Sequence, residues 1–295
     1  MSRPSIFRGA ATALITPLTE TGVDYEALGR LIDWQIEQGI DALVIAGTTG
    51  EGATLTYDEH QETIRYSVER AAGRVPVIAG SGSNDTNRAI TLSRFSCEAG
   101  ADALLVVTPY YNKATQKGLV AMYNAIADAV DKPIILYNVP SRTGVNIEPA
   151  TYLELSKHPN IVAIKEANGN LSKIVETFRL VGDTLDIYSG NDDQVVPLLS
   201  MGGSGVISVL SNVMPRQTHE MCRRFFDGDL AGAAKLQMEY LPLINALFSE
   251  VNPIPVKAAM ARMGWCENTL RLPLTPMEEA HWQVLEALMA QQKLI

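Results

Sequence analysis

The sequence contains few cysteines and carries no surplus of positive charge. Cys97, Cys222 and Cys266 lie far apart among 295 residues, so neither a disulfide framework nor a cysteine zinc site is predicted. A formal net charge of -9 and a pI near 5.0 argue against a nucleic-acid partner, because no basic stripe is left to neutralise phosphates. No apolar stretch approaches the roughly 18 residues of a membrane span, and the N-terminal residues lack the apolar core of a signal peptide. We expect a cytoplasmic protein with no membrane partner.

Short apolar runs recur along the chain, each ending in polar or glycine-rich residues. They are nearly continuous rather than alternating in polarity, which is typical of strands covered on both faces. The eight runs lie at residues 10–17, 41–47, 75–80, 101–109, 133–138, 161–166, 185–190 and 205–209. Helical patterns separate them at residues 24–38, 58–72, 86–99, 115–130, 148–157, 170–181 and 192–201.

This alternation predicts an α/β fold, because eight β-α units in about 225 residues match a closed (β/α)8 TIM barrel in size and order. A doubly wound open sheet is the alternative. However, neither G-T-T-G-E-G (47–52) nor G-S-G-S-N-D (80–85) has the glycine spacing of a nucleotide-binding fold. Only helical patterns follow residue 226. We therefore expect a catalytic barrel domain at 1–225 and a C-terminal helical domain at 226–295.

In such a barrel the active site lies at the C-terminal ends of the strands, and those ends contain no histidine. The four histidines fall in helical or loop segments, at His60, His158, His219 and His281. Glu166, Asp192 and Asp193 are the only carboxylates suited to a magnesium site, and Asp192 is better interpreted as the N-cap of the next helix. We therefore expect no metal.

Lys165 stands out because it follows the apolar run I-V-A-I at 161–164. Strand alternation predicts that Ala163 and Lys165 share one face with Ile161, while Glu166 points to the other face. A lysine here could extend to the barrel rim or pair with a distant acid. Alternatively, desolvation could lower its pKa, so that the neutral amine attacks a ketone and forms a Schiff base. The residue pattern alone leaves both readings open.

Hydroxyl groups at two neighbouring strand ends could move protons to and from such a lysine. Tyr137 ends the run at 133–138, and Thr48 and Thr49 follow the run at 41–47. Taken singly, a strand-end tyrosine is more often a packing residue, and T-T-G is more often a turn.

Five motifs together resemble the dihydrodipicolinate synthase family of class I aldolases. They are G-T-T-G-E (47–51), T-P-Y-Y-N (108–112), Y-N-V-P-S-R-T-G (137–144), I-K-E-A-N-G (164–169) and G-G-S-G-V-I-S (202–208). The resemblance implies a lyase in which pyruvate forms a Schiff base with Lys165 and needs no cofactor. Its enamine would attack L-aspartate-4-semialdehyde, and the product would cyclise. This is the first committed step towards diaminopimelate and lysine.

The resemblance also implies roles for individual residues. The catalytic set is Lys165, Tyr137, Thr48 and Tyr111, with Tyr111 reaching the site from a second chain across a dimer interface. Substrate-binding roles fall to Thr49 for the pyruvate carboxylate, Arg142 for the semialdehyde carboxylate, and Gly190 and Ile207 as pocket walls. A homotetramer built as a dimer of dimers is expected.

Relatives on the same barrel act on other aldehydes, among them N-acetylneuraminate lyase and the 2-keto-3-deoxygluconate aldolases. The Thr48–Thr49 pair favours the synthase, as does Arg142, since a sugar aldehyde has less use for a guanidinium. A non-catalytic binding barrel is a further alternative, but it predicts loss of Lys165 or Tyr137, and both are present.

Many members of the family are inhibited by lysine at the dimer interface. The matching positions here are Gly52, Ala53, Tyr57, His60, Asn84, Arg88 and Tyr110. Sensitive members usually carry histidine at the position of Tyr57 and glutamate at that of Arg88. Because Arg88 would repel the ammonium of lysine, weak or absent inhibition is predicted.

Overall fold

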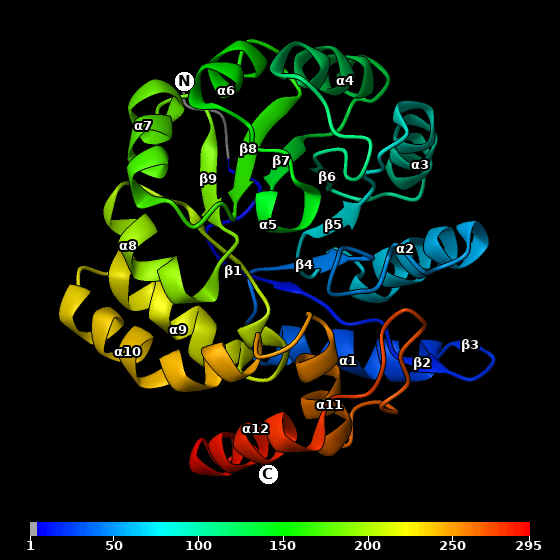
Figure 1. Ribbon diagram of the computed structural model, residues 1–295, viewed down its shortest axis with the longest axis vertical. Coiled ribbons are helices and arrows are strands. Elements are labelled where there is room, and N and C mark those ends of the chain that lie inside the picture. The colour runs from blue at the N-terminus through cyan, green and yellow to red at the C-terminus, as the bar shows by residue number, and fades with distance from the viewer. Residues whose placement is uncertain (1–4) are drawn as a thin grey trace.

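The computed structural model describes residues 5–295 and contains a closed barrel of eight parallel strands (Figure 1). Around the barrel the order is β1, β10, β9, β8, β7, β6, β5 and β4, which pairs again with β1. The strands are β1 (Gly9–Ala13), β4 (Ala42–Ile45), β5 (Val77–Gly80), β6 (Ala103–Val107), β7 (Ile134–Asn138), β8 (Ile161–Glu166), β9 (Asp186–Ser189) and β10 (Gly205–Ser208). The expected TIM barrel is confirmed, and each strand lies within its predicted range to about one residue.

The helices that follow the strands surround the barrel in Figure 1. They are α1 (Tyr25–Glu37), α2 (Tyr57–Ala71), α3 (Thr86–Glu98), α4 (Gln116–Asp128), α6 (Pro149–Leu155), α7 (Leu171–Val181), α8 (Val195–Ser200) and α9 (Pro215–Phe226). Local capping explains several starts, because a side-chain oxygen accepts an otherwise unpaired N–H of the first turn. Asp24 accepts from the Ala27 N–H at 2.9 Å, and Thr56 forms a reciprocal capping box with Glu59.

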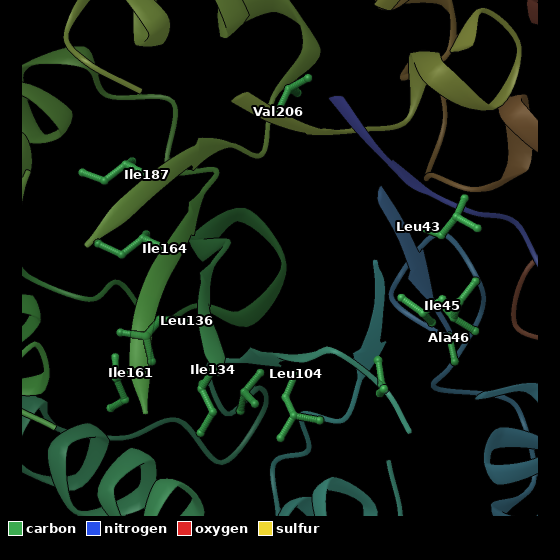
Figure 2. Packing of buried hydrophobic residues seen from close by; sticks show 14 of the residues in the cluster. Leu43, Ile45, Ala46, Leu104, Ile134, Leu136, Ile161, Ile164, Ile187 and Val206 are labelled. Atoms are coloured by element: carbon green, nitrogen blue, oxygen red, sulfur yellow. The ribbon is translucent and has the colours of Figure 1, made fainter. Parts of the chain in front are cut away.

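Two apolar clusters lie on the two faces of the barrel wall. Figure 2 shows the outer one, in which Leu43, Leu104, Leu136, Ile164 and Ile187 point outward towards the helices. The inner cluster fills the barrel with aliphatic side chains and three aromatic ones, and its members include Ala11, Val44, Ala163, Tyr137 and Tyr188. Both faces of the barrel wall are therefore packed with apolar side chains, which explains the nearly continuous apolar runs.

The predicted alternation in β8 is correct for residues 163–166 and wrong at its start. The pairing of β7 with β8 shifts register after Ile134, where Ile134 is opposite Ile161 but Ile135 is opposite Ala163. This irregularity inserts one residue, so Ile161 joins the outer cluster and Val162 the inner one. Lys165 keeps the inward direction of Ala163.

Several short elements were not expected from the sequence. A hairpin of β2 (Leu18–Thr19) and β3 (Gly22–Val23) precedes α1, and α5 (Pro140–Thr143) follows β7. The segment expected as one helix at 192–201 contains a 3-10 turn, η1 (Asp192–Gln194), before α8.

The C-terminal helices gather at one side of the barrel in Figure 1. They are α10 (Leu230–Ala246), α11 (Ile254–Arg262) and α12 (Glu279–Gln291), all within the region where only helical patterns were predicted. A third apolar cluster joins them to Leu31 of α1 and to Leu210 after β10. Trp34 and Trp265 also pack across this junction, with ring centroids 4.7 Å apart. Within residues 5–295, no helix has both the length and the apolar character needed to cross a bilayer.

Candidate active site

Lys165 and Tyr137 lie side by side at the C-terminal ends of β8 and β7. The two residues are direct partners in the strand pairing, and the Nζ of Lys165 lies 4.4 Å from the centroid of the Tyr137 ring. Both side chains are buried, with 6% and 7% of their surface exposed. The structure therefore brings together the lysine and the tyrosine that the sequence singled out.

Burial changes the acid-base behaviour of Lys165. Loss of hydration disfavours the ammonium and lowers the pKa of Lys165 from 10.5 to about 7. The guanidinium of Arg142 acts in the same direction, while the carboxylate of Asp192 opposes it. Roughly half of the lysine is thus neutral at pH 7, and a neutral amine is a nucleophile.

Asp192 does not cap the following helix, so that interpretation was wrong. Its carboxylate is buried and accepts the backbone N–H groups of Val209 and Leu210, both at 2.9 Å. It therefore ties η1 to the segment after β10. Burial raises the pKa of Asp192, and the positive charge of Lys165 is among the influences that lower it.

Tyr137 is protonated at neutral pH. Burial raises the pKa of Tyr137 above 10, against smaller opposing effects of Arg142 and the Thr48 hydroxyl. A phenol in this state can donate a proton to a developing alkoxide and recover it later. Thr48 is exposed just after β4 and, like Tyr137, lines a cavity.

Thr49 is buried and is held by a residue that the sequence analysis missed. The side-chain amide of Asn252, located between α10 and α11, donates to the Thr49 Oγ1 at 3.0 Å. Two residues further on, Glu51 forms a fully buried ion pair with Lys257 of α11. Desolvation lowers the pKa of Lys257, and Glu51 opposes this effect. A lysine within the apolar helix I-P-V-K-A-A-M-A was the signal that could have found this pair.

Arg142 lies on the short helix α5. Pro140 begins this helix, and Gly144 ends it with a φ of 68°, a left-handed conformation that suits glycine. The guanidinium is partly free in solvent, and its Nη2 donates to the backbone oxygen of Asn252 at 3.2 Å. Arg142 can therefore present further donors to an anion.

Gly190 and Ile207 lie where close packing is needed. The N–H of Gly190 donates to the Glu166 oxygen at 2.7 Å, and a Cβ at this position would lie 2.7 Å from the Cβ of Ala167. Only glycine fits there without movement. Ile207 of β10 is buried in the inner cluster together with Tyr137 and Ala163.

Tyr111 does not reach the site of its own chain. Its side chain is 93% exposed on the loop after β6, with a φ of 67° that is unusual for a bulky residue. This placement leaves the predicted catalytic set incomplete within a single chain.

A cavity of about 320 Å³ opens beside the site. Thr48, Tyr137 and Arg142 line it, whereas Lys165 and Thr49 do not. Five of the seven residues matched to lysine inhibition also line it, namely Gly52, Ala53, His60, Arg88 and Tyr110. Tyr57 and Asn84 are not on its wall.

His60 of α2 is buried. Its Nε2 lies 2.8 Å from the Gly80 oxygen, and burial lowers the pKa of the imidazole. Across residues 5–295, no group of three His, Cys, Asp or Glu side chains is arranged to hold a metal ion.

Comparisons with known proteins identify the family of the chain. The model of the dihydrodipicolinate synthetase family matches residues 6–292. The 4-hydroxy-tetrahydrodipicolinate synthase of Lachnoclostridium phytofermentans is 56% identical over 283 residues, covering 95% of this chain and 96% of that protein. That of Caldicellulosiruptor saccharolyticus is also 56% identical, over 282 residues and 95% of each chain.

Solved structures extend the likeness to three dimensions. Dihydrodipicolinate synthase from Thermotoga maritima superposes with a TM-score of 0.97 at 42% identity, covering 99% of this chain and 100% of that one. The enzyme from Aquifex aeolicus gives a TM-score of 0.96 at 45% identity, covering 98% and 99%. With a family match over nearly its whole length, the chain belongs to the dihydrodipicolinate synthetase family.

Proposed function

We propose that this protein condenses pyruvate with L-aspartate-4-semialdehyde and cyclises the product, the 4-hydroxy-tetrahydrodipicolinate synthase reaction. Family membership confirms the expectation of a lyase. The observation that carries the proposal is the buried Lys165, with its pKa near 7, against the ring of Tyr137.

The first step forms the Schiff base. The neutral Nζ of Lys165 attacks the ketone carbon of pyruvate, and the carbonyl oxygen, after protonation, leaves as water. Tyr137, whose ring lies against Lys165, would supply and recover protons during this exchange. The resulting iminium withdraws electrons, so a proton is lost from the pyruvate methyl group and an enamine forms.

The second step forms the carbon–carbon bond. The enamine carbon attacks the aldehyde of the semialdehyde, and Tyr137 protonates the new alkoxide. The amino group of the semialdehyde then adds to the iminium carbon and displaces Lys165, which closes the ring and frees the enzyme.

Two groups are placed to bind the substrate carboxylates. The Thr49 hydroxyl, at the end of β4, would donate to the carboxylate of pyruvate. Arg142 lines the cavity, and its planar fork would hold the carboxylate of the semialdehyde. Gly190 and Ile207 would form the wall on the far side of Lys165.

The names of the relatives favour the synthase over N-acetylneuraminate lyase and the keto-deoxygluconate aldolases. Arg142 lines the cavity and favours an acidic second substrate, because a sugar aldehyde has less use for a guanidinium. Purified protein should condense pyruvate with the semialdehyde and should not cleave sialate or 2-keto-3-deoxygluconate. If the protein instead cleaved one of these sugar acids and did not condense the semialdehyde, the proposed substrate would be wrong but the Schiff-base mechanism would still apply.

The proposal includes a cytoplasmic location, assembly as a homotetramer, and weak or absent inhibition by lysine. Arg88 supports the last point, because its guanidinium lines the cavity where an effector ammonium would bind. In a coupled assay, millimolar lysine should leave the initial rate nearly unchanged. Strong inhibition below about 1 mM would contradict this point.

The Schiff base is tested by trapping. Borohydride added with pyruvate should reduce the iminium to a stable adduct, and mass spectrometry should locate it on Lys165. Lys165→Ala should give no adduct, while Arg142→Ala should still be trapped but use the semialdehyde poorly. An adduct on another lysine, or none, would refute the mechanism.

A further inference from the structure

The C-terminal helical region reaches into the proposed site through one side chain, Asn252. This residue lies 203 positions from Thr49 in the sequence and is 5% exposed. Its amide nitrogen contacts the Thr49 Oγ1 at 3.0 Å, and its backbone oxygen accepts from the Arg142 guanidinium at 3.2 Å. Asn252 thus touches both groups to which the proposed function assigns a substrate carboxylate.

The contact with Thr49 controls the direction of a proton. A hydroxyl has one proton to donate and two lone pairs that accept. Because the Asn252 amide nitrogen only donates, it occupies a lone pair of Thr49 and leaves the hydroxyl proton pointing elsewhere. A carboxylate accepts only, so a hydroxyl that must bind one needs its proton free.

Neighbouring contacts hold Asn252 in place. Five residues along the chain, Lys257 makes the fully buried ion pair with Glu51, on the same loop as Thr49. The Lys257 N–H also donates to the oxygen of Pro253, the N-cap of the helix that carries this lysine, and Pro253 directly follows Asn252. The ion pair and the amide therefore connect the same two segments.

We propose that Asn252 is a positioning residue of this site, orienting the Thr49 hydroxyl as a donor to the pyruvate carboxylate. This inference rests on the proposed function, because it takes from it the roles of Thr49 and Arg142. The side chain of Asn252 serves the first substrate, while its backbone oxygen steadies the residue that binds the second. A side-chain substitution should therefore separate the two steps.

The test measures borohydride trapping of Lys165 against pyruvate concentration, which reports on the first substrate alone. Asn252→Ala should raise the half-saturating pyruvate concentration about tenfold, the effect of one lost hydrogen bond to a charged ligand. The KM for the semialdehyde should change much less, because alanine keeps the backbone oxygen that Arg142 contacts. An equal rise in both constants would indicate a merely structural role and would overturn the proposal.

A double-mutant cycle tests whether Asn252 acts through Thr49. Thr49→Val removes the hydroxyl, and adding Asn252→Ala to it should weaken pyruvate no further, since the two changes remove one interaction. If the two substitutions instead weaken pyruvate binding by the product of their separate effects, Asn252 acts independently of Thr49, which would contradict the proposal.

Asn252→Asp is the isosteric variant, chosen because Asn252 is buried. An ionised aspartate can only accept from the Thr49 hydroxyl, so at a pH where it is ionised it should take up the hydroxyl proton and weaken pyruvate binding at least as much as alanine does. Wild-type affinity for pyruvate in Asn252→Asp would overturn the proposal. Wild-type protein that is not trapped at Lys165 would instead refute the proposed function itself.

Discussion

Residues with unusual ionisation mark this site. Two neighbours in β8 have a pKa near 7 through burial, Lys165 lowered from 10.5 and Glu166 raised from 4.5. They face opposite sides of the strand: the lysine lies against the inward ring of Tyr137, and the glutamate accepts a hydrogen bond from Tyr152 of α6 outside the barrel. The sequence predicted this division from alternation at residues 163–166.

The first prediction concerns the pH dependence of Schiff-base formation. Only the neutral amine attacks, so the amine gains reactivity as pH rises through the pKa of Lys165. The rate of borohydride trapping at low pyruvate should rise with pH, with a midpoint near the value of about 7, and then level off. Stopped-flow quench measurements from pH 5.5 to about 9 cover this range.

Glu166→Gln is the matched control, because Glu166 also titrates near pH 7 and directly follows Lys165. The rising limb should persist in this variant if it belongs to the lysine. Loss of the limb in Glu166→Gln, or a midpoint near 10 in the wild type, would assign the dependence to another group.

At the scale of elements, a polar network fastens β7 and β8 on their outer side. The Glu166 carboxylate accepts from Asn138 of β7 and from the hydroxyl of Tyr152 in α6, both at 2.9 Å. Asn138 pairs with Glu166 in the strand register, directly after the pairing of Tyr137 with Lys165. The network therefore helps to keep Lys165 and Tyr137 opposite each other.

The second prediction is that Tyr152→Phe destabilises the protein more at high pH than at low pH. Removing a buried donor costs about 1–3 kcal/mol, and the larger cost applies where the acceptor is charged. Glu166 has a pKa of about 7, so it is ionised at pH 9 and mostly protonated at pH 6. Without the hydroxyl its pKa rises further, and this additional loss of stability appears only as pH increases through that range.

Urea unfolding of wild type and variant at pH 6 and 9 measures this difference. Tyr123→Phe is the control, since Tyr123 is equally buried but donates to the neutral backbone oxygen of Val106 at 3.2 Å. Its cost should not depend on pH. Equal losses for Tyr152→Phe at both pH values would show that the Glu166 carboxylate does not ionise in this range.

Local sequence signals determine most of the elements but not all of their details. Asp24 and Thr56 are local signals of a helix start, because capping depends on residues only three positions apart in the sequence. The irregular pairing at Ile134 and Ile161 could not be predicted, since it depends on the register of two strands rather than on either alone. It reverses the faces of Ile161 and Val162 without changing their apolar character.

At the scale of the whole molecule, the site joins segments from both ends of the chain. Lys165 and Tyr137 were predictable because barrel topology brings the strand ends together. Asn252 and the Glu51–Lys257 pair were not, because their partners lie more than 200 positions away in a region that patterns describe only as helical. The division at residue 225 stays a prediction, and α9 packs on both β1 and α10 across it.

The position of Tyr111 leads to the third prediction, which concerns a second chain. Its side chain is 93% exposed and does not line the cavity of its own chain, whereas the family resemblance implies a place for it in the proton relay. In a symmetric dimer each Tyr111 could enter the site of the partner. Tyr111→Phe and Lys165→Ala should each be nearly inactive alone, and mixed dimers should regain activity.

The reason is geometric. In a mixed dimer, the chain carrying Tyr111→Phe keeps its Lys165 and receives an intact Tyr111 from the chain carrying Lys165→Ala. One of its two sites is then complete. Random reassociation makes half of the dimers mixed, so roughly a quarter of wild-type activity should be restored.

Subunits are mixed after reversible dissociation, and the rate is compared with that of each variant treated alone. Mixing Lys165→Ala with Tyr137→Phe is the control, because β8 and β7 of one chain supply both groups and a mixed dimer completes no site. Absence of recovery in the first mixture, with dimers re-formed, would place Tyr111 outside the relay or within its own chain.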